Sequence, residues 1–107
     1  MGLDAYVYRN PASLHHRLGN ISTISQLRSE ILAVAQNRVP ILLEKVVYEG
    51  AHAGDYLPLT EIDPLEVELD LLAEAAEGRF QLLGRFIEEM RELAAAAKAE
   101  KNPIYFG

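Results

Sequence analysis

Apolar and polar residues alternate near the start of the chain, where Leu3, Ala5 and Val7 take every second position. A period of two is typical of a strand with one buried face, so the pattern predicts a strand over residues 3–8. Residues 12–20 have no clean period and are predicted to form a loop.

The next segment has apolar residues three and four positions apart, which is the spacing of one face of a helix. These residues are Ile24, Leu27, Ile31 and Val34. Thr23 and Gln26 have capping-box spacing, so the helix is predicted to begin at Thr23. It ends on the approach to Pro40, because the residue before a proline is kept out of the α-helical region.

Residues 41–48 form a run that is apolar on both faces except at Glu44 and Lys45. Such a run predicts the central strand of a sheet. Residues 50–55 carry two glycines and are predicted to form a turn, after which residues 56–60 return as the second strand of a hairpin. Pro58 confines that second strand to a sheet edge, because proline cannot donate to a strand ladder.

The last third of the chain carries two helical stripes with Gly78 between them. Asp63 is the predicted N-cap of the first helix, and Pro64 fits its first position. The stripes are Leu65, Leu69, Leu72 and Ala76, then Phe80, Leu83, Ile87, Met90, Ala94 and Ala97. Glycine costs about 1 kcal/mol relative to alanine inside a helix, so Gly78 predicts a break, with one long helix as the alternative. Residues 104–106, after Asn102-Pro103, are predicted to form a short strand or a tail on the core.

These elements predict an α+β domain, with a small mixed β-sheet and about three helices packed on one face. The predicted order is β-α-β-β-α-α, with a possible final strand. If the first two strands are parallel, they form a right-handed βαβ unit with the helix between them.

Composition narrows the class of protein. A chain of 107 residues suits one domain, residues 1–107, with a single core. The absence of cysteine excludes disulfides and thiolate metal sites, and the net charge of -6 argues against nucleic acid as a partner. No apolar run approaches the roughly 20 residues of a membrane span, and the start shows no targeting signal. We therefore expect a cytoplasmic protein that does not contact the membrane and carries no cofactor.

Acidic residues are concentrated in one part of the chain. Residues 61–77 hold seven carboxylates and no basic residue, so the rest of the chain carries a net charge of +1. Four of them recur on one predicted helix face: Glu66, Asp70, Glu74 and Glu77. Either this ridge is a solvated outer face whose first acids favour the helix dipole, or it is a docking surface for a basic partner.

The segment Tyr48–Tyr56 is the candidate for chemistry. Its glycines can hold a turn that exposes His52 and Asp55, which would act as an acid–base pair if they lay within hydrogen-bond reach. A hairpin tip with an aspartate cap explains the same residues. His15 and His16 are adjacent, so in a strand they point to opposite sides, and a metal site with His52 requires the loops to meet.

The alanine-rich stretch 94–97 lets another backbone approach closely. It predicts either packing within the core or the seam of a homodimer.

Three short segments of the chain can be compared with other proteins: the opening Met-Gly-Leu-Asp-Ala-Tyr-Val-Tyr, the turn Val-Tyr-Glu-Gly-Ala-His-Ala-Gly-Asp and the closing Asn-Pro-Ile-Tyr-Phe. In these segments it resembles small bacterial proteins that begin with Met-Gly-Leu-Asp and have no assigned activity. The resemblance implies a bacterial source, and some small acidic proteins of this kind act as immunity or antitoxin-like partners. It carries over no catalytic residue.

Two hypotheses of function follow from these features. The first is a non-enzymatic protein–protein interaction module, immunity-like or regulatory, that forms a homodimer and uses the acidic helix. The second is a small-ligand-binding or metal-assisted enzyme centred on the Tyr48–Tyr56 turn.

Overall fold

The chain begins with a β-hairpin. In the computed structural model, which describes residues 2–48 and 54–107, β1 (Gly2–Val7) pairs antiparallel with β2 (Leu14–Asn20). The predicted strand at the start of the chain is confirmed, with Leu3, Ala5 and Val7 buried. The loop predicted over residues 12–20 is wrong from Leu14 onward. The pattern is hidden there because His16 takes one of the inward positions of β2, and Leu18 is the strand's one fully buried side chain.

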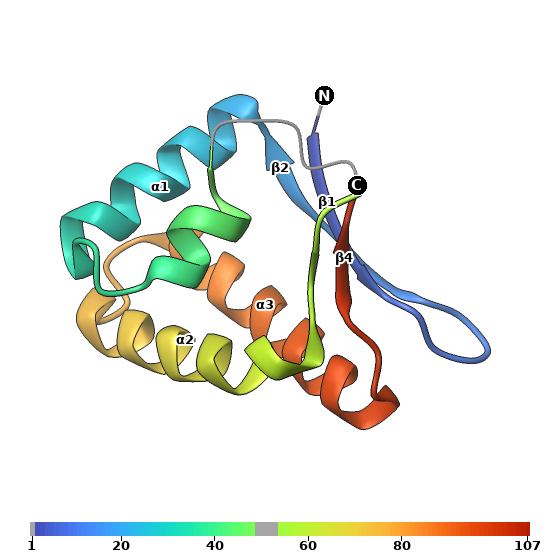
Figure 1. Ribbon diagram of the computed structural model, residues 1–107. Helices are drawn as coiled ribbons and strands as arrows, with labels where there is room; N and C mark the ends of the chain where they lie inside the picture. Colours follow the sequence, from blue (N-terminus) through green and yellow to red (C-terminus); the bar gives the residue numbers. More distant parts are fainter. Residues whose placement is uncertain (1, 49–53) are drawn as a thin grey trace.

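The sheet has four strands in the order β2-β1-β4-β3 (Figure 1). The last strand, β4 (Ile104–Phe106), lies between β1 and the short edge strand β3 (Tyr56–Leu57). The α+β class and the final strand are therefore confirmed. Every pairing is antiparallel, so the predicted βαβ unit does not form and the sheet is not mixed in direction. The observed order places two strands before the first helix.

Residues 40–46 are helical and no strand forms over residues 41–48, so the predicted central strand is wrong. The helical turn begins at Pro40 and continues as the π-helical segment η1 (Leu42–Val46). Its start is held by Glu68, whose two carboxylate oxygens accept the backbone N–H groups of Ile41 and Leu42, each at 3.0 Å. A short apolar run has no period that separates a buried strand from a buried helical turn. The strand β3 consequently pairs with β4 instead of forming a hairpin with this segment.

The first long helix, α1 (Ile21–Ala35), begins two residues before the predicted Thr23. Its N-cap is Asn20, whose side-chain oxygen accepts the backbone N–H of Thr23 at 2.9 Å. The four apolar positions predicted for this helix lie on its inner side, with Val34 half-buried.

The second long helix, α2 (Ile62–Ala76), follows directly on a 3-10 turn, η2 (Leu59–Glu61). Asp63 therefore lies in the first turn of α2, and its predicted role as N-cap is wrong. The helix ends where Glu77 and Gly78 adopt left-handed backbone angles, with φ of 51° and 71°. The third helix, α3 (Gln81–Glu100), begins after this break, so the alternative of one long helix is excluded.

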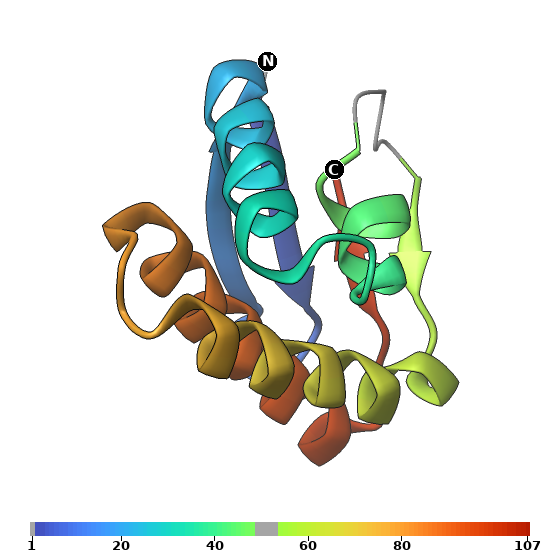
Figure 2. The ribbon, with the colours of Figure 1, turned by 90° about the vertical axis from the view of Figure 1, so that its left-hand side faces the viewer.

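All three long helices lie on one face of the sheet, as predicted (Figures 1 and 2). α3 packs directly on β1, β2 and β4, while α2 packs on α3 and α1. The buried stripes of α2 and α3 meet the inward side chains of the sheet in one core. In the part of the chain that is described, no helix is long and apolar enough to cross a bilayer. The opposite face of the sheet is covered by no described element.

Candidate functional site

Four tyrosines occupy the uncovered face of the sheet. They are Tyr6 and Tyr8 on or next to β1, Tyr56 on β3 and Tyr105 on β4; we call this surface the tyrosine face. In the strand register, Tyr6 lies opposite both His15 and Tyr105, and Tyr105 lies opposite Tyr56. The alternation that buries one side of each strand thus builds a row of rings across all four strands.

The rings of the tyrosine face touch one another. Tyr105 is central: the centroid of its ring lies 5.8 Å from the ring centroid of Tyr6, 5.3 Å from that of Tyr8 and 6.0 Å from that of Tyr56. The Tyr6 and Tyr105 rings are stacked at 24°, while Tyr8 meets the Tyr6 ring edge-on at 79° and 5.4 Å. Offset and edge-to-face contacts of this kind are favourable for aromatic pairs. Even so, Tyr8 and Tyr56 remain 53% and 55% exposed.

The tyrosine face has polar groups but little net charge. A hydrogen bond with Tyr8, followed by partial desolvation, raises the pKa of Tyr6 above the ordinary tyrosine value, so its hydroxyl stays neutral at physiological pH. Beside the row, the Asp4 carboxylate lies 3.1 Å from Nε2 of His15. Arg17 follows on β2, with its guanidinium over the backbone of Gly2.

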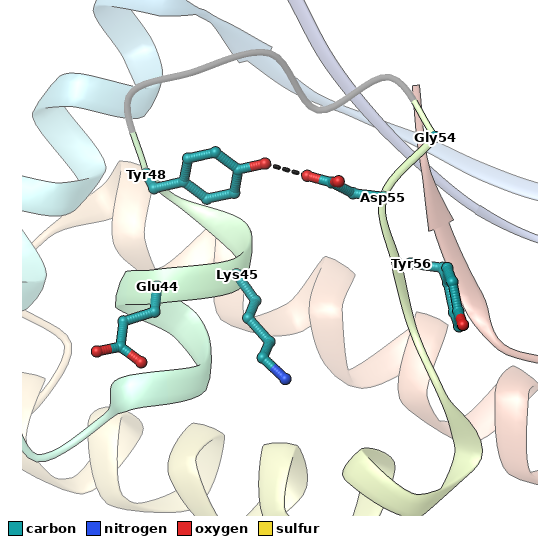
Figure 3. Close-up of a pocket in the computed structure, with 6 residues that line it drawn as sticks. All are labelled: Glu44, Lys45, Tyr48, Gly54, Asp55 and Tyr56. Carbon is teal, nitrogen blue, oxygen red and sulfur yellow. Dashed lines mark hydrogen bonds between the residues drawn. The ribbon is translucent and has the colours of Figure 1, made fainter.

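A second candidate site is a cleft at the edge of the sheet, between η1 and the segment that leads into β3 (Figure 3). This cleft of about 350 Å³ is lined by Glu44, Lys45, Tyr48, Gly54, Asp55 and Tyr56. The Tyr48 hydroxyl donates a hydrogen bond to Asp55, which raises the pKa of Tyr48 to about 12. Lys45 is held by an ion pair with Glu61. Tyr56 borders both the cleft and the tyrosine face.

The cleft coincides with part of the predicted Tyr48–Tyr56 site. Asp55 is present there, but its carboxylate is engaged by a tyrosine hydroxyl. The other predicted member of the acid–base pair, His52, lies outside the described residues.

The two adjacent histidines point in opposite directions. His15 is on the outer side of β2 near Asp4, whereas His16 faces α3, with its ring nitrogens 3.4 Å from Glu89 and 3.5 Å from Glu92. They therefore do not converge on one metal. Across residues 2–48 and 54–107, no cluster of three histidine or carboxylate side chains has the arrangement of a metal site.

The acidic segment is less isolated in the structure than in the sequence. Asp63 and Glu66 both pair with Lys98 at 2.9 Å, and Asp70 pairs with Arg91 at 2.8 Å. Glu61 pairs with Lys45, and Glu68 accepts backbone N–H groups. Among the described residues, Glu74 and Glu77 form no ion pair. The basic partners come from α3 and η1, which no local pattern within residues 61–77 reveals.

The predicted dimer seam is used within the chain. Ala94 and Ala97 are fully buried in the core, where α3 packs on the sheet and α2. Of the two interpretations of this stretch, core packing is the one observed at these two positions.

The sequence reasoning missed the tyrosine face. One signal was present, since Tyr6 and Tyr8 take the positions between the buried residues of β1. Finding the whole face also required knowing that β4 inserts between β1 and β3, and that order is not encoded in any local pattern.

Comparison with known proteins adds no identity. No protein-family model, curated protein or solved structure matches this chain. The resemblance to small bacterial proteins beginning Met-Gly-Leu-Asp therefore stays a prediction, and the function is argued from the surfaces themselves.

Proposed function

We propose that this protein is a non-catalytic protein–protein interaction module that binds its partner through the tyrosine face. The observation that carries the proposal is the row of four tyrosines, each in ring contact with at least one other, on a sheet face that nothing in the described chain covers (Figure 1). Tyrosine is enriched at protein interfaces and at their energetic hot spots, because it combines a large apolar ring with a polar hydroxyl.

The geometry of the rings suits such a role. Because each ring packs against a neighbouring ring, the rotamer of each tyrosine is already restricted. The side chains therefore lose little further conformational entropy when a partner binds. The rings also stand on strands rather than on a loop, so their spacing is set by the backbone pairing of β1, β4 and β3. A preformed surface of this kind favours a partner that is itself folded.

The acidic helix remains a prediction as a second contact surface. Glu66 and Asp70 are engaged by Lys98 and Arg91, so a basic partner would have to compete with these internal pairs. Glu74 and Glu77, near the C-terminal end of α2, are the exposed carboxylates of the ridge without such pairs among the described residues.

Site-specific photo-crosslinking tests the proposal. A benzoylphenylalanine at Tyr8 is expected to form covalent adducts with protein in living cells, and the Tyr105→Ser variant of the same probe protein should lose them. The matched control places the probe at Val67, which is 66% exposed on α2. Equal adduct yields from positions 8 and 67, or no adducts from position 8, would show that the tyrosine face is not an interface.

A second candidate function is the binding of a small ligand in the cleft, which the position of Asp55 and Tyr48 favours. A panel of small polar compounds, screened by thermal shift on the wild type and on Tyr48→Phe, examines it. A compound that stabilises both proteins equally would place its site elsewhere.

A further inference from the structure

We propose that the partner of the tyrosine face is a second copy of this chain, in a two-fold dimer whose sheets pack face to face. This inference rests on the proposed function and names the partner of the same surface. It also gives the predicted homodimer an interface different from the alanine-rich stretch of α3.

The distribution of charge supports a second copy. The tyrosine face is close to neutral, because its outward strand positions carry one acid, Asp4, and one base, Arg17, beside His15. The carboxylates of α2 and α3 lie on the helical layer, on the other side of the sheet. Two copies joined by their sheets would place these acidic layers at opposite ends of the dimer. A strongly basic partner would instead be drawn to the helical layer.

The face is also complementary to itself, as a two-fold interface requires. Asp4 and Arg17 are opposite each other in the β1–β2 register, yet Asp4 pairs with His15, and Arg17 forms no ion pair among the described residues. Each copy therefore offers one acid and one base, the base unpaired within the described part of the chain, on neighbouring strands beside the tyrosine row. We infer that Arg17 of each copy pairs with Asp4 of the other.

The size of the face predicts a weak dimer. The four strands together hold 18 residues, because β3 and β4 have only two and three. At roughly 3.4 Å per residue and about 4.8 Å between strands, they cover only about 300 Å² per copy. Stable interfaces bury about 800 Å² per partner, so this one belongs to the small, transient class. We expect a dissociation constant of about 10 µM or weaker, in a dimer whose formation depends on concentration.

Single-stranded nucleic acid is a less suitable partner. Aromatic faces that stack bases are accompanied by a basic groove that follows the phosphates. Arg17 is the single lysine or arginine at the outward positions of the described strands, and the chain as a whole carries -6.

Sedimentation velocity over a concentration series from about 5 µM to about 500 µM, around the expected constant, is the first test. The wild type is expected to shift from monomer to dimer. The double variant Tyr8→Ser/Tyr56→Ser should weaken association at least tenfold, whereas the control Ile21→Ser/Val67→Ser, at exposed apolar positions of α1 and α2, should not. A wild type that stays monomeric, or a dimer that the tyrosine variant leaves unchanged, overturns the proposal.

A charge exchange between copies provides the second test and does not depend on the tyrosine variant folding. Asp4→Arg alone places two arginines against each other across the interface, and Arg17→Asp alone places two aspartates against each other. Each variant by itself should therefore associate at least tenfold more weakly than the wild type. An equimolar mixture of the two variants restores pairs of opposite charge, and a heterodimer should form with near wild-type affinity. A mixture no better than either variant contradicts the two-fold arrangement.

The outcomes also separate this inference from the proposed function. If the wild type is monomeric and the probe at Tyr8 captures a different protein in cells, the proposed interaction module is supported and the proposed dimer is contradicted. If the wild type is monomeric and instead binds a labelled oligo-uridine through the tyrosine face, both the protein–protein interaction module and the dimer are contradicted.

Discussion

At the scale of single residues, Glu68 shows how one side chain settles a local structure. It is 8% exposed, and its carboxylate takes the place of the missing helical carbonyls at the start of the 40–46 turn. Burial raises the pKa of Glu68, and the nearby Glu44 and Glu61 carboxylates act in the same direction, against the lowering effect of the two backbone hydrogen bonds. The same residue that caps η1 therefore carries an unfavourable charge.

Replacing Glu68 by glutamine should lower the free energy of unfolding by about 1–3 kcal/mol, because the amide nitrogen cannot accept the second backbone N–H. Urea denaturation measures this change. The exposed Glu74→Gln is the control and should remain within about 0.5 kcal/mol of the wild type. Equal stability of Glu68→Gln and the wild type would mean that the carboxylate does not hold the turn.

The stability difference should also depend on pH. Because the pKa of Glu68 is higher in the folded than in the unfolded chain, the folded state binds more protons between these two values. The wild type therefore loses stability as pH rises through this window, above the ordinary glutamate pKa, and glutamine does not. The advantage of the wild type over Glu68→Gln should shrink with rising pH in denaturation curves, and a growing advantage would reverse the assigned shift.

The Tyr48 hydroxyl offers a direct spectroscopic readout of the cleft. With a pKa of about 12, it should ionise after the ordinary tyrosines in an absorbance titration of the folded protein. Its hydrogen bond stabilises the folded chain below the ordinary tyrosine pKa of 10.0 and ceases to do so as pH rises to about 12. Asp55→Asn removes the acceptor charge and should bring this ionisation to lower pH, with Tyr48→Phe identifying the transition. An unchanged titration in Asp55→Asn would separate the two residues.

At the scale of elements, two glycines with equally open surroundings have opposite roles. Gly78 lies in the break between α2 and α3 with φ of 71°, whereas Gly84 lies inside α3. A Cβ at either position meets no atom of another part of the structure within 4 Å. The difference between them is therefore one of backbone conformation, not of space.

The same substitution should consequently have opposite signs at the two sites. Gly78→Ala should destabilise the protein by about 1 kcal/mol, because alanine is strained at positive φ. Gly84→Ala should stabilise it by roughly 0.5–1 kcal/mol through helix propensity. Thermal unfolding of the two variants beside the wild type measures both changes. Two shifts of the same sign would contradict the assignment of Gly78 as a helix terminator.

The helices show what the sequence could predict and what it could not. The stripes of α2 and α3 and the break at Gly78 follow from spacing and glycine chemistry, which are local properties. The 41–48 segment was mispredicted because its conformation depends on Glu68, 26 and 27 residues away along the chain. β2 was missed because its pairing with β1 supplies the order that its own polar pattern lacks.

At the scale of the whole molecule, the candidate site depends on topology. The sequence singled out Asp55 and the acidic helix as candidate sites. The fold engages their carboxylates within the chain, because it brings Tyr48 beside Asp55 and Lys98 and Arg91 beside the helix. Of the tyrosine face, the two members on or next to β1, Tyr6 and Tyr8, could be predicted from the alternation of that strand alone. Its completion requires the last strand of the chain to lie beside the first, an arrangement set by the packing of all three helices on one side of the sheet.

This topology also makes a prediction about ionic strength. Two copies of net charge -6 repel each other, and salt screens that repulsion over about 8–10 Å at physiological concentrations. In a dimer joined by the sheets, the acidic layers are separated by more than this screening length, since two sheets alone are stacked about 10 Å apart. The dissociation constant should therefore change less than about threefold between roughly 0.1 and 0.5 M NaCl. Sedimentation at these two salt concentrations measures it. A tenfold tightening at high salt would place the acidic helices against each other and locate the contact on the helical layer.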